Sequence, residues 1–94
     1  MKEKVWLYPG LAAWHFVNVS KKASKEIKDG YLFIGKRGFG SVPVIVTIGN
    51  TSWKTSIFPS KELGLYILPL KKEVRKAENI KSGDIISYSI EIKI

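Results

Sequence analysis

The sequence predicts a small, mainly β domain with two short helices. From Ile85 to the end of the chain, apolar and polar residues alternate with period two, which is typical of a half-buried strand. In the middle, two β-rich segments flank Gly49-Asn50, a dipeptide that suits the two-residue loop of a hairpin. Two lysine-rich segments carry apolar residues at helical spacing, and these predict the helices.

The hairpin is predicted over residues 42–57. Glycine at the first loop position favours a type II′ turn, which places Val46 opposite Trp53 and Val42 opposite Ile57. These residues share one face, so the register agrees with the hydrophobic pattern. We therefore expect the Val46–Trp53 pair to face the interior of a mostly antiparallel sheet.

Further strands are predicted before and after this hairpin, at residues 4–8, 13–19 and 65–70. A turn at residues 58–60 connects the hairpin to the last of them. Pro69 marks an edge or a terminus, because proline cannot donate a ladder hydrogen bond. Residues 31–34 fit either a strand or a loop.

The first helix is predicted to follow Ser20, a good N-cap, and to stop at Gly30. The second is predicted over residues 71–80, with Val74 and Ala77 on one face.

An internal echo relates the two helical segments, because "VNVSKKASKEI" (17–27) resembles "LPLKKEVRKAE" (68–78). In this alignment Val17 matches Leu68. The echo predicts two strand–helix halves related by a pseudo-two-fold axis.

Charge is the clearest pointer to a partner. The 94 residues form one domain, with 16 Lys and Arg against 8 Asp and Glu and a net charge of +8. This balance suits nucleic acid, another polyanion or a small anionic ligand, although surplus lysine can also serve solubility alone. Pro9-Gly10 interrupts the apolar stretch near the N-terminus, so we expect no membrane span and a cytoplasmic protein.

The residues give little support to an enzyme. The loop "GKRGFG" at 35–40 contains a GXXG sequence, but it leads into a strand and lacks the helical context of a nucleic-acid clamp or P-loop. Arg37 in this loop remains a candidate anion contact. Cysteine is absent and His15 is the only histidine, so we expect no catalytic residues, no metal site and no cofactor.

Four lysines at the predicted helix starts form the main candidate site: Lys21, Lys22, Lys71 and Lys72. A cation is disfavoured there, because a helix N-terminus is already partially positive. Because this unfavourable placement of lysines occurs at both helix starts, it suggests an anion site made by lysines and free helix amides. The alternative is that the long side chains extend into water.

A second hypothesis is a pocket for a small anionic ligand, lined by Arg37, Trp53, Lys54, Ser56 and Tyr66. A third is a protein-interaction module. The three tryptophans are able to stack on bases or a ligand, but in a small β domain such rings more often fill the core. We expect the core role.

The segment from residue 37 to residue 84 resembles the bacterial family called domain of unknown function 1905. The resemblance is carried by "RGFGSVPV", "IGNTSWKTSIFP", "YILPLKKEVRKAE" and the "GD" before the last strand. The segment "AWHFVNV" extends it over nearly the whole chain.

This resemblance implies a small closed double-split β-barrel, similar to AbrB/MazE-type regulators, in which one chain supplies both halves. It implies no catalytic residues. DNA binding would follow by analogy of fold alone. Those regulators bind as dimers, so both a monomer and a homodimer are compatible with the sequence.

Overall fold

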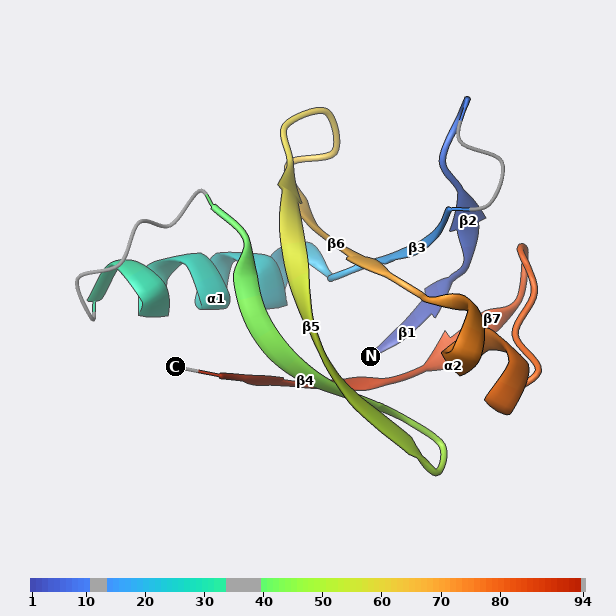
Figure 1. Ribbon diagram of the computed structural model, residues 1–94. Helices are drawn as coiled ribbons and strands as arrows, with labels where there is room; N and C mark the ends of the chain where they lie inside the picture. Colours follow the sequence, from blue (N-terminus) through green and yellow to red (C-terminus); the bar gives the residue numbers. More distant parts are fainter. Residues whose placement is uncertain (11–13, 34–39, 94) are drawn as a thin grey trace.

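The computed structural model of the chain describes residues 1–10, 14–33 and 40–93 (Figure 1). A six-stranded antiparallel sheet has the order β2-β3-β6-β5-β4-β8, and a two-stranded antiparallel sheet pairs β1 with β7. The strands are β1 (Lys2–Lys4), β2 (Trp6–Leu7), β3 (His15–Asn18), β4 (Val42–Ile48), β5 (Thr51–Ser60), β6 (Leu65–Pro69), β7 (Ile85–Ser87) and β8 (Ser89–Ile92). The helices are α1 (Lys21–Phe33) and α2 (Lys72–Ala77).

These elements confirm a mainly β, antiparallel fold with two helices. Neither sheet closes on itself, so the closed double-split barrel stays a prediction, as does the likeness to AbrB/MazE-type regulators. Within the described ranges, no helix is long and apolar enough to cross a membrane.

The central hairpin has the predicted register. Val46 lies opposite Trp53 and Val42 opposite Ile57. Gly49 has a φ of 55°, whereas Asn50 is not among the residues with positive φ, as a type II′ turn requires. Val46 is fully buried, but Trp53 is only partly buried and packs against the edge of the core.

Strand β5 continues through the turn predicted at residues 58–60, which was wrong. Residues 51–57 pair with β4, and residues 58–60 then pair with β6 before the turn at 61–64. Pro59 lies opposite Tyr66, between the pairs made by Phe58 and Ser60. Its backbone nitrogen points away from β6, so the missing N–H removes no hydrogen bond of this ladder.

The first helix begins as predicted, with the backbone N–H of Ala23 donating to Ser20 Oγ at 3.2 Å. It continues past Gly30 to Phe33, so both the predicted stop and the strand or loop at residues 31–33 were wrong. A glycine ends a helix when it adopts a left-handed conformation, and Gly30 is not among the glycines with positive φ.

The second helix is shorter than predicted. Val74 is buried, but Ala77 is exposed, so their shared apolar face was wrong. Asn79 adopts a φ of 53° soon after the helix, and the chain then buries Ile80 in the core. This early left-handed residue explains why the apolar contact comes from beyond the helix.

Strands β3 and β6 pair about a local two-fold relation that the echo predicts. Val17 lies directly opposite its echo partner Leu68. The N–H of Val19 donates to the carbonyl of Tyr66 at 2.9 Å, and the N–H of Leu70 donates to that of His15 at 2.9 Å. Each bond is the echo image of the other.

The core is built mainly from aliphatic side chains, together with Tyr66 and Tyr88. The expectation that the tryptophans fill it was wrong for Trp14, which is 54% exposed, whereas Trp6 and Trp53 are partly buried and Trp53 packs against the core. Along β3, Val17 faces the core, so alternation directs Trp14 to the outer face. The small core leaves the large rings at its margin.

Candidate functional site

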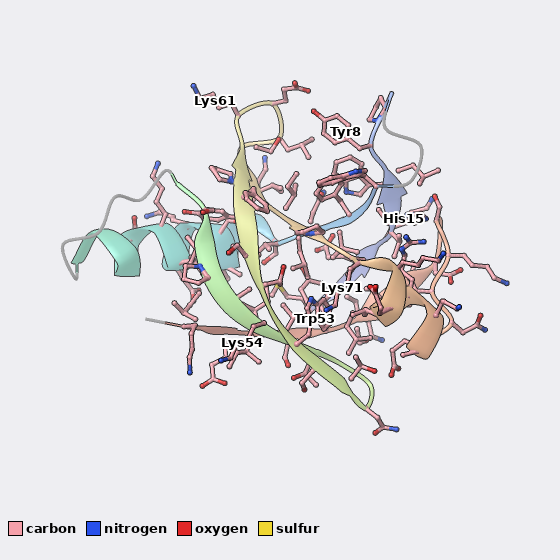
Figure 2. All side chains as sticks on the ribbon, in the orientation of Figure 1. Tyr8, His15, Trp53, Lys54, Lys61 and Lys71 are labelled. Atoms are coloured by element: carbon pink, nitrogen blue, oxygen red, sulfur yellow. The ribbon has the colours of Figure 1, made fainter. Side chains whose placement is uncertain are left out.

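A cleft of about 420 Å³ opens where β5 diverges from β6 (Figure 2). Residues 53–55 of β5 line one side, and residues 69–72 at the end of β6 and the start of α2 line another. Trp14 and His15 complete it from the start of β3. Figure 2 shows His15, Trp53, Lys54 and Lys71 coming from these separate elements.

The cleft exists because β5 changes partners. Among the described residues, the part of β5 up to residue 57 pairs with β4 alone, and none of them pairs with its other edge beside the cleft. In a two-residue hairpin the residues next to the loop exchange hydrogen bonds, and every second pair repeats this pattern. The backbone N–H and C=O of Lys54 therefore point away from β4, toward the open edge.

Three aromatic side chains, which we call the cleft aromatics, line this site: Trp14, Trp53 and Phe58. Trp14 and Phe58 are 54% and 43% exposed. Rings of this size offer flat apolar surfaces to a ligand, and their exposure to water leaves those surfaces available.

Four basic side chains, which we call the cleft cations, line it as well: Lys54, Lys71, Lys72 and Arg75. The three lysines are exposed, whereas Arg75 is partly buried and its Nε donates to the carbonyl of Leu70 at 3.1 Å. That bond holds the guanidinium beside the start of α2.

The described residues that line the cleft include no Asp or Glu. The acidic residue nearest in sequence is Glu73, in the first turn of α2 beside Lys72, and no salt bridge is found between it and the cleft cations among the described residues. Across residues 1–10, 14–33 and 40–93, the salt bridge found joins Lys25 to Asp29 at 2.7 Å, away from the cleft. The hydrogen bond and charge of Asp29 raise the pKa of Lys25. A cluster of cations without such partners attracts anions.

A family model described as "Domain of unknown function (DUF1905)" matches residues 2–90. The chain belongs to this family. The match spans both helices, the cleft and all strands up to the first half of β8. No curated protein matches the chain.

The DUF1905 structure brings four of the sequence-predicted site residues together, namely Trp53, Lys54, Lys71 and Lys72. It separates Lys21 and Lys22 from them. The helices follow the antiparallel strands β3 and β6, which pair at Val17 and Leu68 and run in opposite directions from that pair. The two helix starts therefore lie about 20 Å apart along the strands, at ~3.3 Å per residue. Figure 1 shows α1 and α2 on opposite sides of the molecule.

The remaining predicted residues lie elsewhere. Ser56 of β5 pairs with Pro43 of β4 and is not among the described lining residues. Tyr66 is buried in the core. Arg37 lies outside the described residues, as does the rest of the loop at 35–39. Of the five residues predicted to line one small-ligand pocket, the described structure places Trp53 and Lys54 in the cleft lining.

Sequence reasoning missed Trp14, His15, Phe58 and Arg75 as cleft residues. Alternation gave a usable signal for Trp14, which falls on the face opposite Val17. Arg75 had no such signal, because its position depends on the tertiary bond of its Nε to the carbonyl of Leu70.

In the described part of the chain, no group of three or more His, Cys, Asp or Glu side chains is arranged to hold a metal ion. The described residues of the cleft present cationic groups, exposed aromatic rings and the backbone N–H and C=O of Lys54.

Proposed function

We propose that this DUF1905 domain is a non-enzymatic binding domain whose cleft takes an anionic ligand with an aromatic part. The observation that carries the proposal is the convergence of the cleft aromatics and the cleft cations on one cleft without an acidic lining residue.

The size of the cleft supports this proposal. Its volume of about 420 Å³ lies within the range of roughly 300–1,000 Å³ that is typical of small-molecule sites. An aromatic ring of the ligand would stack on the cleft aromatics, and its anionic group would contact the lysines. The backbone of Lys54 adds one donor and one acceptor with fixed directions.

A titration with adenosine monophosphate tests the proposal, because this probe joins a flat ring to a phosphate. Binding is followed by tryptophan fluorescence and by NMR signals of the three indole N–H groups. The double variant Lys71→Glu/Lys72→Glu should weaken binding at least tenfold, because it reverses two cleft cations. The indole signals of Trp14 and Trp53 should shift in the wild-type protein.

The matched control is Lys21→Glu/Lys22→Glu, which makes the same change of net charge at the other helix start. It should alter affinity less than threefold. Equal losses in both variants would show binding by net charge alone, and no binding by the wild-type protein at low salt would refute the proposal.

We also propose that the two sheets act as one barrel, as the family resemblance implies. The support is continuity of the chain across them: β1 leads through Val5 into β2, and β7 leads through Tyr88 into β8. Val5 N–H donates to the carbonyl of Asp84 at 2.8 Å, and Tyr88 N–H donates to that of Met1 at 2.8 Å, so the β1–β7 pairing extends to the residues that lead into β2 and β8. Equal protection from amide exchange in the β1–β7 pair and in the six-stranded sheet would support one barrel, and earlier loss of protection in the β1–β7 pair would oppose it.

A further inference from the structure

The outer face of strands β2 and β3 carries a cluster of four aromatic rings, which we call the aromatic face: Trp6, Tyr8, Trp14 and Phe16. Phe16 lies at its centre, with ring centroids 5.2 Å from Trp6, 5.7 Å from Tyr8 and 6.0 Å from Trp14. The cluster belongs partly to the cleft, because Trp14 lines both. It continues beyond the cleft through the other three rings.

The strand register places the aromatic face in line with the cleft cations. Phe16 pairs with Trp6 on one side and with Pro69 on the other. Tyr8 N–H donates to the carbonyl of Trp14 at 3.0 Å, so these two residues are neighbours. Continuing the β3–β6 register by two residues puts Lys71 across from Trp14. A cation and two aromatic residues therefore follow one another across the sheet.

A second hollow, of about 540 Å³, lies at the far end of the aromatic face. Trp6 and Tyr8 line it together with Asn18, Glu62, Leu63 and Ile67. The ring of Trp6 is held in place, since its Nε1–H donates to Asn18 Oδ1 at 2.9 Å. Tyr8 is 41% exposed and lies well away from Lys54 and Lys71 in Figure 2. Trp14 at the cleft and Tyr8 at the second hollow are therefore the exposed rings of the aromatic face, while the central ring of Phe16 is buried.

We propose that the ligand of this domain is single-stranded nucleic acid, lying across the aromatic face from the cleft to the second hollow. This inference rests on the proposed function and names the class of its ligand. Bases stack on the exposed rings of Trp14 and Tyr8, while phosphates contact the cleft cations. Proteins that bind single strands combine these two features, a basic groove and aromatic stacking platforms.

Charge complementarity and exposure favour this occupant over others. The chain carries a net charge of +8, and the described residues of the cleft lining include four cations and no acidic residue, whereas the second hollow is lined by Glu62. The phosphates are therefore placed at the cleft end of the path. A duplex offers stacked bases whose faces cannot reach Trp14 or Tyr8, whereas a single strand exposes each base. Residues of β5, the end of β6, and the segments next to β2 and β3 all line this path, and single-strand sites in small domains take about four nucleotides or more.

Fluorescence anisotropy with labelled oligothymidylates of two to twelve nucleotides tests the inference. Affinity should rise with length to about four nucleotides, fall steeply with added salt and exceed that for a duplex of equal length. Tyr8→Ala should weaken binding of the longer oligonucleotides about tenfold and leave the affinity for adenosine monophosphate unchanged, because Tyr8 does not line the cleft. Trp14→Ala should weaken both.

The matched control is Ile85→Ala, which removes an apolar side chain that is 71% exposed on β7 and should change neither affinity. Binding of adenosine monophosphate without tighter binding of oligonucleotides would overturn this inference and leave the proposed function standing. Failure of both ligands would overturn both. Equal affinity for the duplex would also overturn the inference, as would a dimer that Tyr8→Ala converts to a monomer without loss of oligonucleotide binding.

Discussion

The starts of α1 and α2 are equivalent in the internal echo, yet they differ in what stabilises them. Each follows the end of a strand in the β3–β6 pair. Ser24 Oγ donates to the carbonyl of Val19 at 3.0 Å, and Arg75 Nε donates to the carbonyl of Leu70 at 3.1 Å. Ser24 and Arg75 are echo equivalents, as are the two carbonyls. The same backbone group is thus satisfied by a small hydroxyl in one half and by a cation in the other.

The caps differ in the same direction. Ser20 caps α1, which runs for 13 residues, whereas Lys71 occupies the N-cap position of the six-residue α2 and makes no side-chain cap hydrogen bond. Small polar side chains therefore stabilise the first helix start, and cations that line the cleft replace them at the second. The difference shows how one strand–helix pattern can serve stability in one half and present charge in the other.

The largest expected effect comes from breaking the contact that both halves share. Leu68 is fully buried and lies opposite Val17. Leu68→Ala should lower the free energy of unfolding by about 2–5 kcal/mol, because it removes buried methyl groups and leaves a cavity. Urea denaturation followed by tryptophan fluorescence measures this. A loss below about 1 kcal/mol would show that the two halves do not depend on this contact.

The next effect compares the two equivalent side chains. The buried Ser24 Oγ also accepts the N–H of Tyr66 at 3.0 Å, so Ser24→Ala leaves two buried backbone groups without their partner. Its cost should be about 1–3 kcal/mol. Arg75→Ala should cost less, at about 0.5–1.5 kcal/mol, because water can reach the partly exposed site. A larger loss for Arg75→Ala in urea denaturation would reverse the assignment of roles.

Exchanging the caps should move stability in opposite directions. Ser20→Ala should lower the free energy of unfolding by about 0.5–2 kcal/mol. Lys71 already has the extended conformation of an N-cap, with φ −70° and ψ 159°. Lys71→Ser should therefore raise stability by up to about 1 kcal/mol by supplying the missing cap, while weakening anion binding. Thermal melts check both variants, and destabilisation by Lys71→Ser would contradict this view of α2.

The smallest expected effect on stability at neutral pH concerns Tyr88. Its hydroxyl donates to the carbonyl of Asn18 at the end of β3 and so links β3 to the C-terminal part of the chain. Burial raises the pKa of Tyr88, and the charge of Glu3 adds to this. The unfolded pKa is about 10, so the contribution is fully present below that pH and is lost as pH rises through the higher folded pKa. Thermal midpoints between pH 8 and 11 should fall less for Tyr88→Phe than for wild type. Parallel curves would contradict this.

The sequence by itself determined the local features of this protein. The register of Val46 with Trp53, the cap at Ser20 and the alternation that buries Ile86 and exposes Ser87 all follow from turn geometry and period-two patterning. The echo predicted a two-fold relation between the strand–helix halves, and its matched residues Val17 and Leu68 pair directly. These features depend on residues close in the chain, or on a repeated pattern.

Only the tertiary structure decided which of two faces is covered and which distant residues meet. Alternation places Trp14 and Val17 on opposite faces of β3, but the packing of the rest of the chain decides that Val17 is buried and Trp14 exposed. Strand β5 changed partners after residue 57, because β6 rather than local propensity supplies the edge that residues 58–60 pair with. The cleft depends on the divergence of β5 from β6, and it brings together Lys54 from the β4–β5 hairpin and Lys71 from the start of α2. No local pattern encodes such a meeting.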